Sequence, residues 1–178
     1  MSGFPEHPAW DFTLRVYGTP GVAPACLELQ SRHGIDVTLM LFCLWHGSVR
    51  AAPLGRDLPD LMAAARDWQE HTVLPIRSAR QWLKSRAEGL EAPEGTRLYK
   101  AVLGMEIECE HAELLILARQ AQALCGEPAD GAGPFPATMA RNLADLLEQY
   151  GIRPDTADRA ALDLILAAAG GKDAQLPS

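Results

Sequence analysis

The sequence predicts an all-α protein, a small multi-helix bundle with a C-terminal helical hairpin. Apolar residues recur every three or four positions through most of the chain, which is the spacing of one helix face. Proline and glycine mark the breaks between these periodic stretches. Hydrophobic residues make up 48% and charged residues 22%, a composition typical of a globular chain that buries a core.

Two short helices open the chain. The first is expected from about Pro8 to Tyr17, because a proline suits a first helical turn and "YGTPG" stops the helix. The second begins between Pro20 and Pro24. It ends before Gly34, which has the position of a C-terminal glycine cap.

The third helix is expected to begin after Asp36, whose side chain can cap it, and to be closed by Gly47. A buried strand over Ile35–Leu41 is the alternative, because a short apolar run that opens with β-branched residues has no diagnostic period. We favour the helix, since the neighbouring pattern is helical and a lone strand would lack partners.

Three longer helices follow: Asp57–Val73, Ile76–Glu88, and one from Glu94 or Thr96 to just before Gly126. Pro75 is expected to kink or end the first of them. The last has apolar residues around much of its circumference, which predicts a central helix that contacts others on several sides.

The chain is divided into a main helical domain, residues 1–125, and a C-terminal part. Residues 126–137 read as a Pro/Gly linker, 138–170 as the helical hairpin and 171–178 as a disordered tail. Whether the hairpin packs on the main domain is left open.

Charge and terminal sequence limit the functional classes. A formal charge of -7 argues against unaided binding to nucleic acid or to an anionic membrane. No signal peptide or membrane span is evident, so we expect a cytoplasmic protein with reduced cysteines. No cofactor motif is present, and the oligomeric state is left open.

Cysteine and histidine occur together in the first third of the chain and raise the question of a zinc site. Cys43 and His46 are three residues apart, and Cys26 and His33 are seven apart, so each pair shares a helix face. Structural zinc sites usually use tight ligand pairs in turns. We therefore favour buried cysteines and helix-terminal histidines, and predict no metal.

The longest helix contains Glu108 and His111, an i, i+3 pair that di-iron bundles project inward. It occurs only once here, so we keep it as a possible pocket in a small-molecule or metal-binding bundle. Glu106, Glu110 and Glu113 cluster on another side and read as a solvated acidic face. Nucleophile and phosphate-binding motifs are absent, which leans against an enzyme.

The segment 76–100 has a formal charge of +3 within this acidic chain. Arg77, Arg80 and Lys84 lie along one helical face, and Trp82 is close by. Because Trp and Arg are enriched in binding hot spots, these four residues are the candidate partner-binding site. The alternative is a solvated basic face with Trp82 in the core.

Residues 8–47 resemble the opening signature of an uncharacterised family of short proteobacterial proteins, known only as a domain of unknown function. The residues that carry the resemblance are Trp10, Asp11, Phe12, Tyr17, Gly21, Val22, Cys26, Leu27, Gln30, Gly34, Asp36, Val37 and "LFCLW" at 41–45. It covers residues 4 to about 125, with Thr38 in place of an expected Asn. The resemblance implies a small bacterial cytosolic helical protein and supplies no activity.

We therefore expect a non-enzymatic adaptor or regulatory protein that binds an unidentified protein partner through residues 76–100. A bundle with a small-molecule or metal site in its core is the first alternative. RNA binding through the same basic segment is the second.

Overall fold

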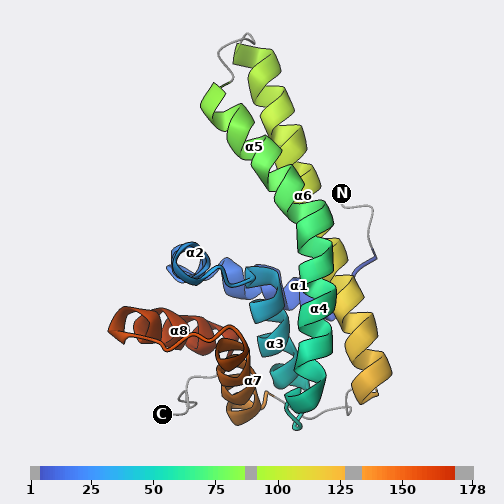
Figure 1. Ribbon diagram of the computed structural model, residues 1–178, viewed down its shortest axis with the longest axis vertical. Helices are drawn as coiled ribbons and strands as arrows, with labels where there is room; N and C mark the ends of the chain where they lie inside the picture. The colour runs from blue at the N-terminus through green and yellow to red at the C-terminus, as the bar shows by residue number, and fades with distance from the viewer. Residues whose placement is uncertain (1–4, 87–91, 127–133, 171–178) are drawn as a thin grey trace.

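The structure, a computed structural model, describes residues 5–86, 92–126 and 134–170, and every regular element in these ranges is helical (Figure 1). The elements are α1 (Pro8–Tyr17), α2 (Val22–His33), α3 (Val37–Val49), η1 (Gly55–Asp57), α4 (Leu58–Trp68), η2 (Gln69–Val73), α5 (Leu74–Arg86), α6 (Ala92–Cys125), α7 (Pro136–Gln149) and α8 (Thr156–Ala169). The all-α prediction is confirmed.

The first three helices begin as the sequence predicts. α2 ends at Gly34, which has a φ of 67° and so occupies the left-handed region that favours glycine. The side chain of Asp36 accepts hydrogen bonds from the backbone N–H of Thr38 (2.9 Å) and Leu39 (3.2 Å) and caps α3. The strand alternative for this segment is wrong.

Gly47 does not end α3, contrary to the prediction, because the helix continues to Val49. A Cβ atom at position 47 would lie 2.6 Å from the backbone nitrogen of Met139 in α7. The glycine therefore allows the backbones of α3 and α7 to approach closely, and α7 packs along α3.

Pro75 does not end a helix either. α4 runs into η2, a π-helical turn in which the backbone N–H of Leu74 bonds to the carbonyl of Gln69, and α5 follows at once. In a regular α-helix the ring of Pro75 would clash with the carbonyl four residues earlier. The wider π turn makes room for that ring, so α4, η2 and α5 form one continuous helical rod.

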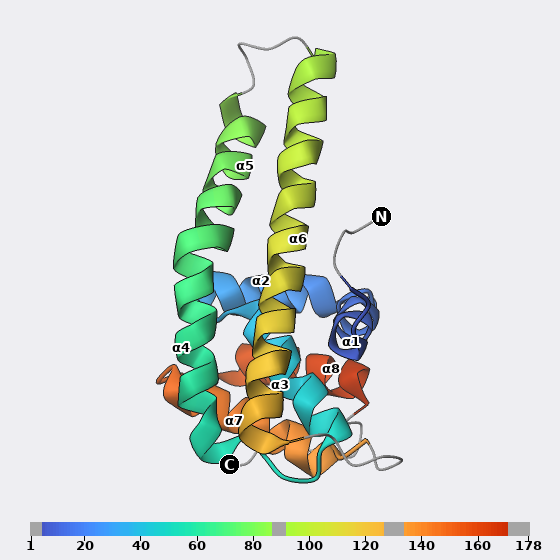
Figure 2. The same cartoon turned by 90° about the vertical axis from the view of Figure 1, so that its right-hand side faces the viewer.

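α6 begins at Ala92, earlier than predicted, and its two halves have different surroundings. The second half packs against α3 and α4, where Leu114 and Leu117 are fully buried. The first half pairs mainly with α5, and near its end the carbonyl of Cys109 accepts a hydrogen bond from Trp68 of α4 at 2.9 Å. α5 and this first half project together from the rest of the molecule (Figures 1 and 2). The prediction of a central helix thus holds only for its second half. We call α5 and residues 92–110 the arm, and the remainder the body.

α7 and α8 are consecutive helices joined by a short loop, and both pack on the first three helices: α7 lies along α3, and α8 lies along α2. Arg32 of α2 donates to Asp155 and Asp158 at the start of α8, both at 2.6 Å. Most of the expected linker, residues 127–133, and the expected tail lie outside the described residues, and Pro136 already begins α7. The predicted domain boundaries stay a prediction.

Among the described residues, no helix combines the length and the apolar character that crossing a membrane requires.

Candidate functional site

The outer surface of the arm displays several large apolar side chains. Trp82 on α5 is 59% exposed and Leu74 on the same helix is 46% exposed. Leu98, Met105 and Ile107 add exposed apolar surface from α6. The other exposed large apolar side chains come from α1, α2, α8 and the far end of α6. Exposed large apolar side chains are typical of interaction surfaces, and the alternative in which Trp82 belongs to the core is wrong.

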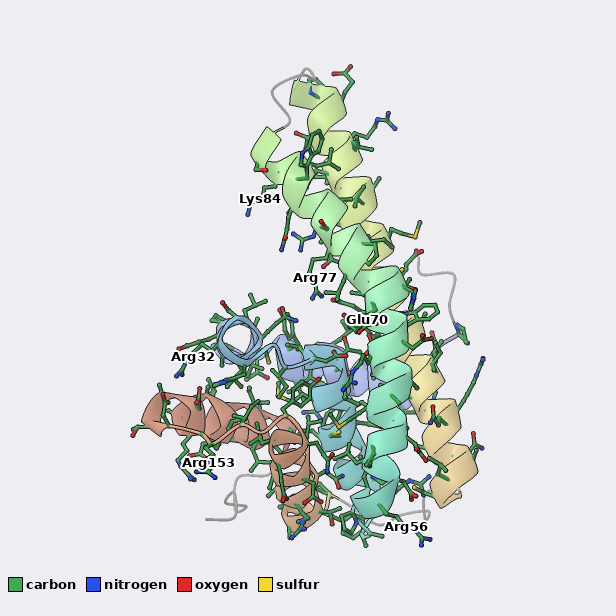
Figure 3. The ribbon with its side chains drawn as sticks, in the orientation of Figure 1. Arg32, Arg56, Glu70, Arg77, Lys84 and Arg153 are labelled. Atoms are coloured by element: carbon green, nitrogen blue, oxygen red, sulfur yellow. The ribbon has the colours of Figure 1, made fainter. Side chains whose placement is uncertain are left out.

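Two of the predicted partner-binding arginines point into the arm rather than out of it. Arg77 donates from Nε to Glu106 (2.8 Å) and from one Nη to Glu110 (2.6 Å). Arg80 donates from Nε and from one Nη to the same Glu106 carboxylate. Both arginine side chains are less than one-fifth exposed, so they bind α5 to α6. Lys84 is exposed near the tip (Figure 3).

The prediction that Glu106, Glu110 and Glu113 form a solvated acidic face is wrong. Glu106 is 4% exposed and Glu113 is fully buried. These carboxyl groups face α5, η2 and the start of α3 instead of water. A helical wheel shows which side chains share a face, but not which face another helix covers, so the wheel of α6 alone could not place them.

Where the arm meets the body, two carboxyl groups share a hydrogen bond. Glu113 bonds to Asp36, the cap of α3. Its other oxygen accepts from the side-chain amide of Gln69 in the π turn at 2.7 Å. The Asp36 Oδ2 and Glu113 Oε1 atoms are buried, and no donor among the described residues reaches them. Two carboxyl oxygens bond to each other only through a proton, so the pair holds one.

Burial, and then the nearby Asp36, raise the pKa of Glu113 to about 11. Burial also raises the pKa of Asp36, but the backbone N–H groups of Thr38 and Leu39 favour its charged form. The proton therefore resides on Glu113. Since the two oxygens that share it are shielded from water, the pair is placed to hold α6 to α3 rather than to exchange protons with a substrate.

Further along the arm, Arg77 and Arg80 determine which carboxyl groups are charged. Burial alone would raise the pKa of Glu106, but Arg80 and Arg77 outweigh it and hold that pKa below its ordinary value. Burial raises the pKa of Glu110, although Arg77 opposes the change. We call this whole set the buried polar seam: Asp36, Gln69, Arg77, Arg80, Glu106, Glu110 and Glu113.

The sequence contains a signal for this seam that helix-by-helix reasoning misses. Arg77 and Arg80 are three residues apart on one helix, and Glu106 and Glu110 are four residues apart on the next. Each pair lies on one helix face, and the two helices are consecutive and antiparallel. Matching opposite charges at those spacings would have paired the two faces.

The predicted pocket residues Glu108 and His111 have different environments. His111 is 3% exposed, and its ring stacks on Trp10 with 4.3 Å between the ring centroids. Burial, and then the neighbouring His7, lower the pKa of His111, so its ring is neutral near pH 7. Glu108 is only half-buried. Trp10 fills the space beside His111 that a ligand would need.

The candidate zinc ligands are distributed over the body. Cys26 and Cys43 are fully buried, and burial raises the pKa of the Cys26 thiol to about 12. His33 bonds to Asp158 at 3.0 Å, and burial lowers the pKa of His46 to about 4. Within the described ranges, no group of three or more His, Cys, Asp or Glu side chains is arranged to hold a metal ion.

Comparison with known proteins identifies a family for this chain. The family model described as "Protein of unknown function (DUF2390)" matches residues 8–117, from α1 into the second half of α6. No curated protein and no solved structure matches the chain. The match covers both partners of the Asp36–Glu113 pair and the whole arm, and it stops short of α7 and α8. The chain belongs to this family of proteins of unknown function, DUF2390.

Proposed function

We propose that the protein is a non-enzymatic adaptor or regulatory protein that binds another protein chain through the outer surface of the arm, with Trp82 as the anchor. The observation that carries the proposal is the exposure of Trp82, which at 59% is the most exposed of the large apolar side chains in the described structure. Burying an exposed tryptophan against a partner would remove a large apolar area from water, and this residue type is enriched in binding hot spots.

The shape of the arm supports the same function. α5 and the first half of α6 contact each other but leave their outer faces uncovered (Figure 2). The buried polar seam holds the two helices together, so a partner would meet a preformed surface and little ordering would be lost on binding. In this proposal Arg77 and Arg80 position the arm, and Trp82 and Lys84 contact the partner.

The alternatives have less support. The small-molecule or metal alternative relied on Glu108 and His111, but His111 is packed against Trp10. A groove of about 710 Å³ lies instead on the body, between α7 and the start of α8, and is open to solvent. RNA binding relied on a continuous basic face, and two of its three named basic residues are neutralised by Glu106 and Glu110.

The proposal places the protein in the cytoplasm of a bacterium, as the family resemblance implies. The test is a photoreactive amino acid at position 82, irradiated in living cells, followed by identification of whatever protein is joined to it. Position 27 is the matched control, because Leu27 is 53% exposed but lies on the body.

We expect a discrete cross-linked product from position 82 and none of the same mass from position 27. The exchange Lys84→Glu should reduce the yield of this product. Equal yields from both positions, or none from position 82, would contradict the proposal. An RNA adduct at position 82 would favour the RNA alternative.

A further inference from the structure

The outer face of α5 has small, uncharged side chains in its centre. Leu74, Ser78 and Trp82 follow one another at intervals of four residues, which places them along one ridge of the helix. Pro75 and Ala79 lie beside them, and all five side chains are exposed. The face therefore has a large apolar side chain at each end and small side chains between them.

This arrangement is self-complementary. Ser78 lies midway between Leu74 and Trp82, so a two-fold axis through Ser78 would bring Leu74 of one arm against Trp82 of another. The small side chains in the centre would let the two helix axes approach closely, and the large ones would fill the space at both ends.

The charges along the arm favour the antiparallel direction. Exposed cations outnumber exposed anions toward the tip, where Lys84 of α5 and Arg97 and Lys100 of α6 outweigh Glu94. Exposed anions outnumber exposed cations at the base, where Asp67, which is 82% exposed, and Glu70 in the π turn outweigh Arg66. Figure 3 shows Lys84 toward the tip and Glu70 midway along the rod, where the arm meets the body. Two antiparallel arms would place the basic tip of each beside the acidic base of the other, whereas parallel arms would repel.

We propose that the partner of the arm is a second copy of this chain, bound in an antiparallel pair in which Trp82 of each copy packs against Leu74 of the other across Ser78. The inference rests on the proposed function, since it names the partner of the same surface. The two bodies stand at opposite ends of the paired arms, so the dimer presents two copies of the body to further partners.

The first experiment measures the mass of the full chain in solution by sedimentation, at concentrations up to about 100 µM. We expect a concentration-dependent rise from 19.3 kDa toward twice that mass. Trp82→Glu should abolish the rise, because it would bury a carboxylate against Leu74. Leu27→Glu on the body is the matched control and should leave the dimer intact, with circular dichroism confirming that both variants are folded.

The second experiment tests the axis and the direction. Ser78→Cys places identical thiols face to face at the two-fold axis, so mild oxidation should give a disulfide-linked dimer much faster than Leu27→Cys does. Lys84→Glu and Glu70→Lys should each weaken the dimer at low salt, and the double variant should restore it, as expected for charges that meet across an antiparallel pair.

The outcomes separate this inference from the proposed function. A chain that stays monomeric, or a dimer that Trp82→Glu leaves intact, overturns the self-pairing. If a monomeric chain still cross-links from position 82 to a different protein, the proposed function stands and only the identity of its partner is wrong. If position 82 captures nothing and the chain is monomeric, both are overturned.

Discussion

The two halves of α6 make opposite kinds of contact along one continuous helix. In the body, Leu114 and Leu117 are fully buried among apolar side chains. In the arm, the side that faces α5 carries Glu106 and Glu110, which bind arginines, while Met105 and other apolar side chains face outward. The arm thus encloses ion-paired side chains and exposes several large apolar ones, which is the opposite of what is usual for these residue types.

This difference shows how the two regions are stabilised. Burial of apolar area stabilises the body, and this hydrophobic contribution does not depend on the orientation of the contacting groups. The arm is held by directional ion pairs and by the hydrogen-bonded Asp36–Glu113 pair at its base. Because polar side chains join α5 to α6, apolar side chains of the arm stay exposed and can contact a partner. If apolar side chains joined the two helices, they would be buried between them.

The largest effect is expected from a cavity in the body half of α6. Leu117→Ala should lower the free energy of unfolding by about 2–5 kcal/mol, because Leu117 is fully buried in the core. Leu124→Ala on the same helix is the control, since Leu124 is 42% exposed. Denaturant unfolding measures both. If both variants lost the same free energy of unfolding, the difference in burial between Leu117 and Leu124 would have no effect on stability.

The second effect concerns the arm half. Glu106→Ala removes the common acceptor of Arg77 and Arg80. It leaves the shielded Arg80 without this carboxylate and Arg77 with Glu110 alone, which should cost about 3 kcal/mol. The loss should be local, so hydrogen exchange should speed up in α5 more than in α3. Glu108→Ala, which changes a half-buried residue on the same helix, is the control. Uniform exchange throughout the chain would show that the arm and body unfold together.

The third effect lies at the boundary between the halves and depends on pH. The pKa of Glu113 rises from an ordinary value of 4.5 to about 11 on folding. Between these values the folded chain holds a proton that the unfolded chain releases, so raising the pH favours unfolding by about 1.4 kcal/mol per pH unit.

Glu113→Gln should remove this slope, because its amide can donate to Asp36 and accept from Gln69 without titrating. The measurement is the free energy of unfolding of both proteins from pH 6 to pH 9, with Glu108→Gln as the control. We expect the Glu113→Gln variant to be the more stable of the two at pH 9. If its stability falls with pH as steeply as that of the natural chain, the shared proton is elsewhere.

The smallest effect is expected on the outer side of the arm half. Met105→Ala should change the free energy of unfolding by no more than about 0.5 kcal/mol, since Met105 is 51% exposed and removing it leaves no cavity. Thermal unfolding at low protein concentration would measure this. A loss of several kcal/mol would show that Met105 is already covered, for example by a second chain.

Most helices could be predicted from the sequence because their signals are local. The cap at Asp36 and the glycine after His33 act on backbone groups within a few residues, and the structure has both. The error at Gly47, and the prediction that the helix could end at Pro75, have another origin. Each residue is a helix breaker by local rules, but α7 explains the glycine and a π turn accommodates the proline. Neither is visible in a window of a few residues.

For the candidate site, too, some features follow from the local sequence and others depend on the tertiary structure. Residues 76–100 combine basic side chains with a tryptophan. This is a property of composition, so the sequence alone shows it. Which of them meet solvent depends on which face of α5 the next helix covers. Arg77 and Arg80 turned out to face Glu106, and Trp82 to face outward.

The sequence by itself determined the all-α class, most of the helix limits and the family, because these depend on residue periodicity, capping and an extended motif. Only the tertiary structure decided that Glu106, Glu110 and Glu113 are shielded, that Asp36 and Glu113 share a proton, and that α5 and α6 stand out as an arm. The physical reason is that a side chain's charge, exposure and pKa depend on its neighbours across the fold, which lie far away along the chain.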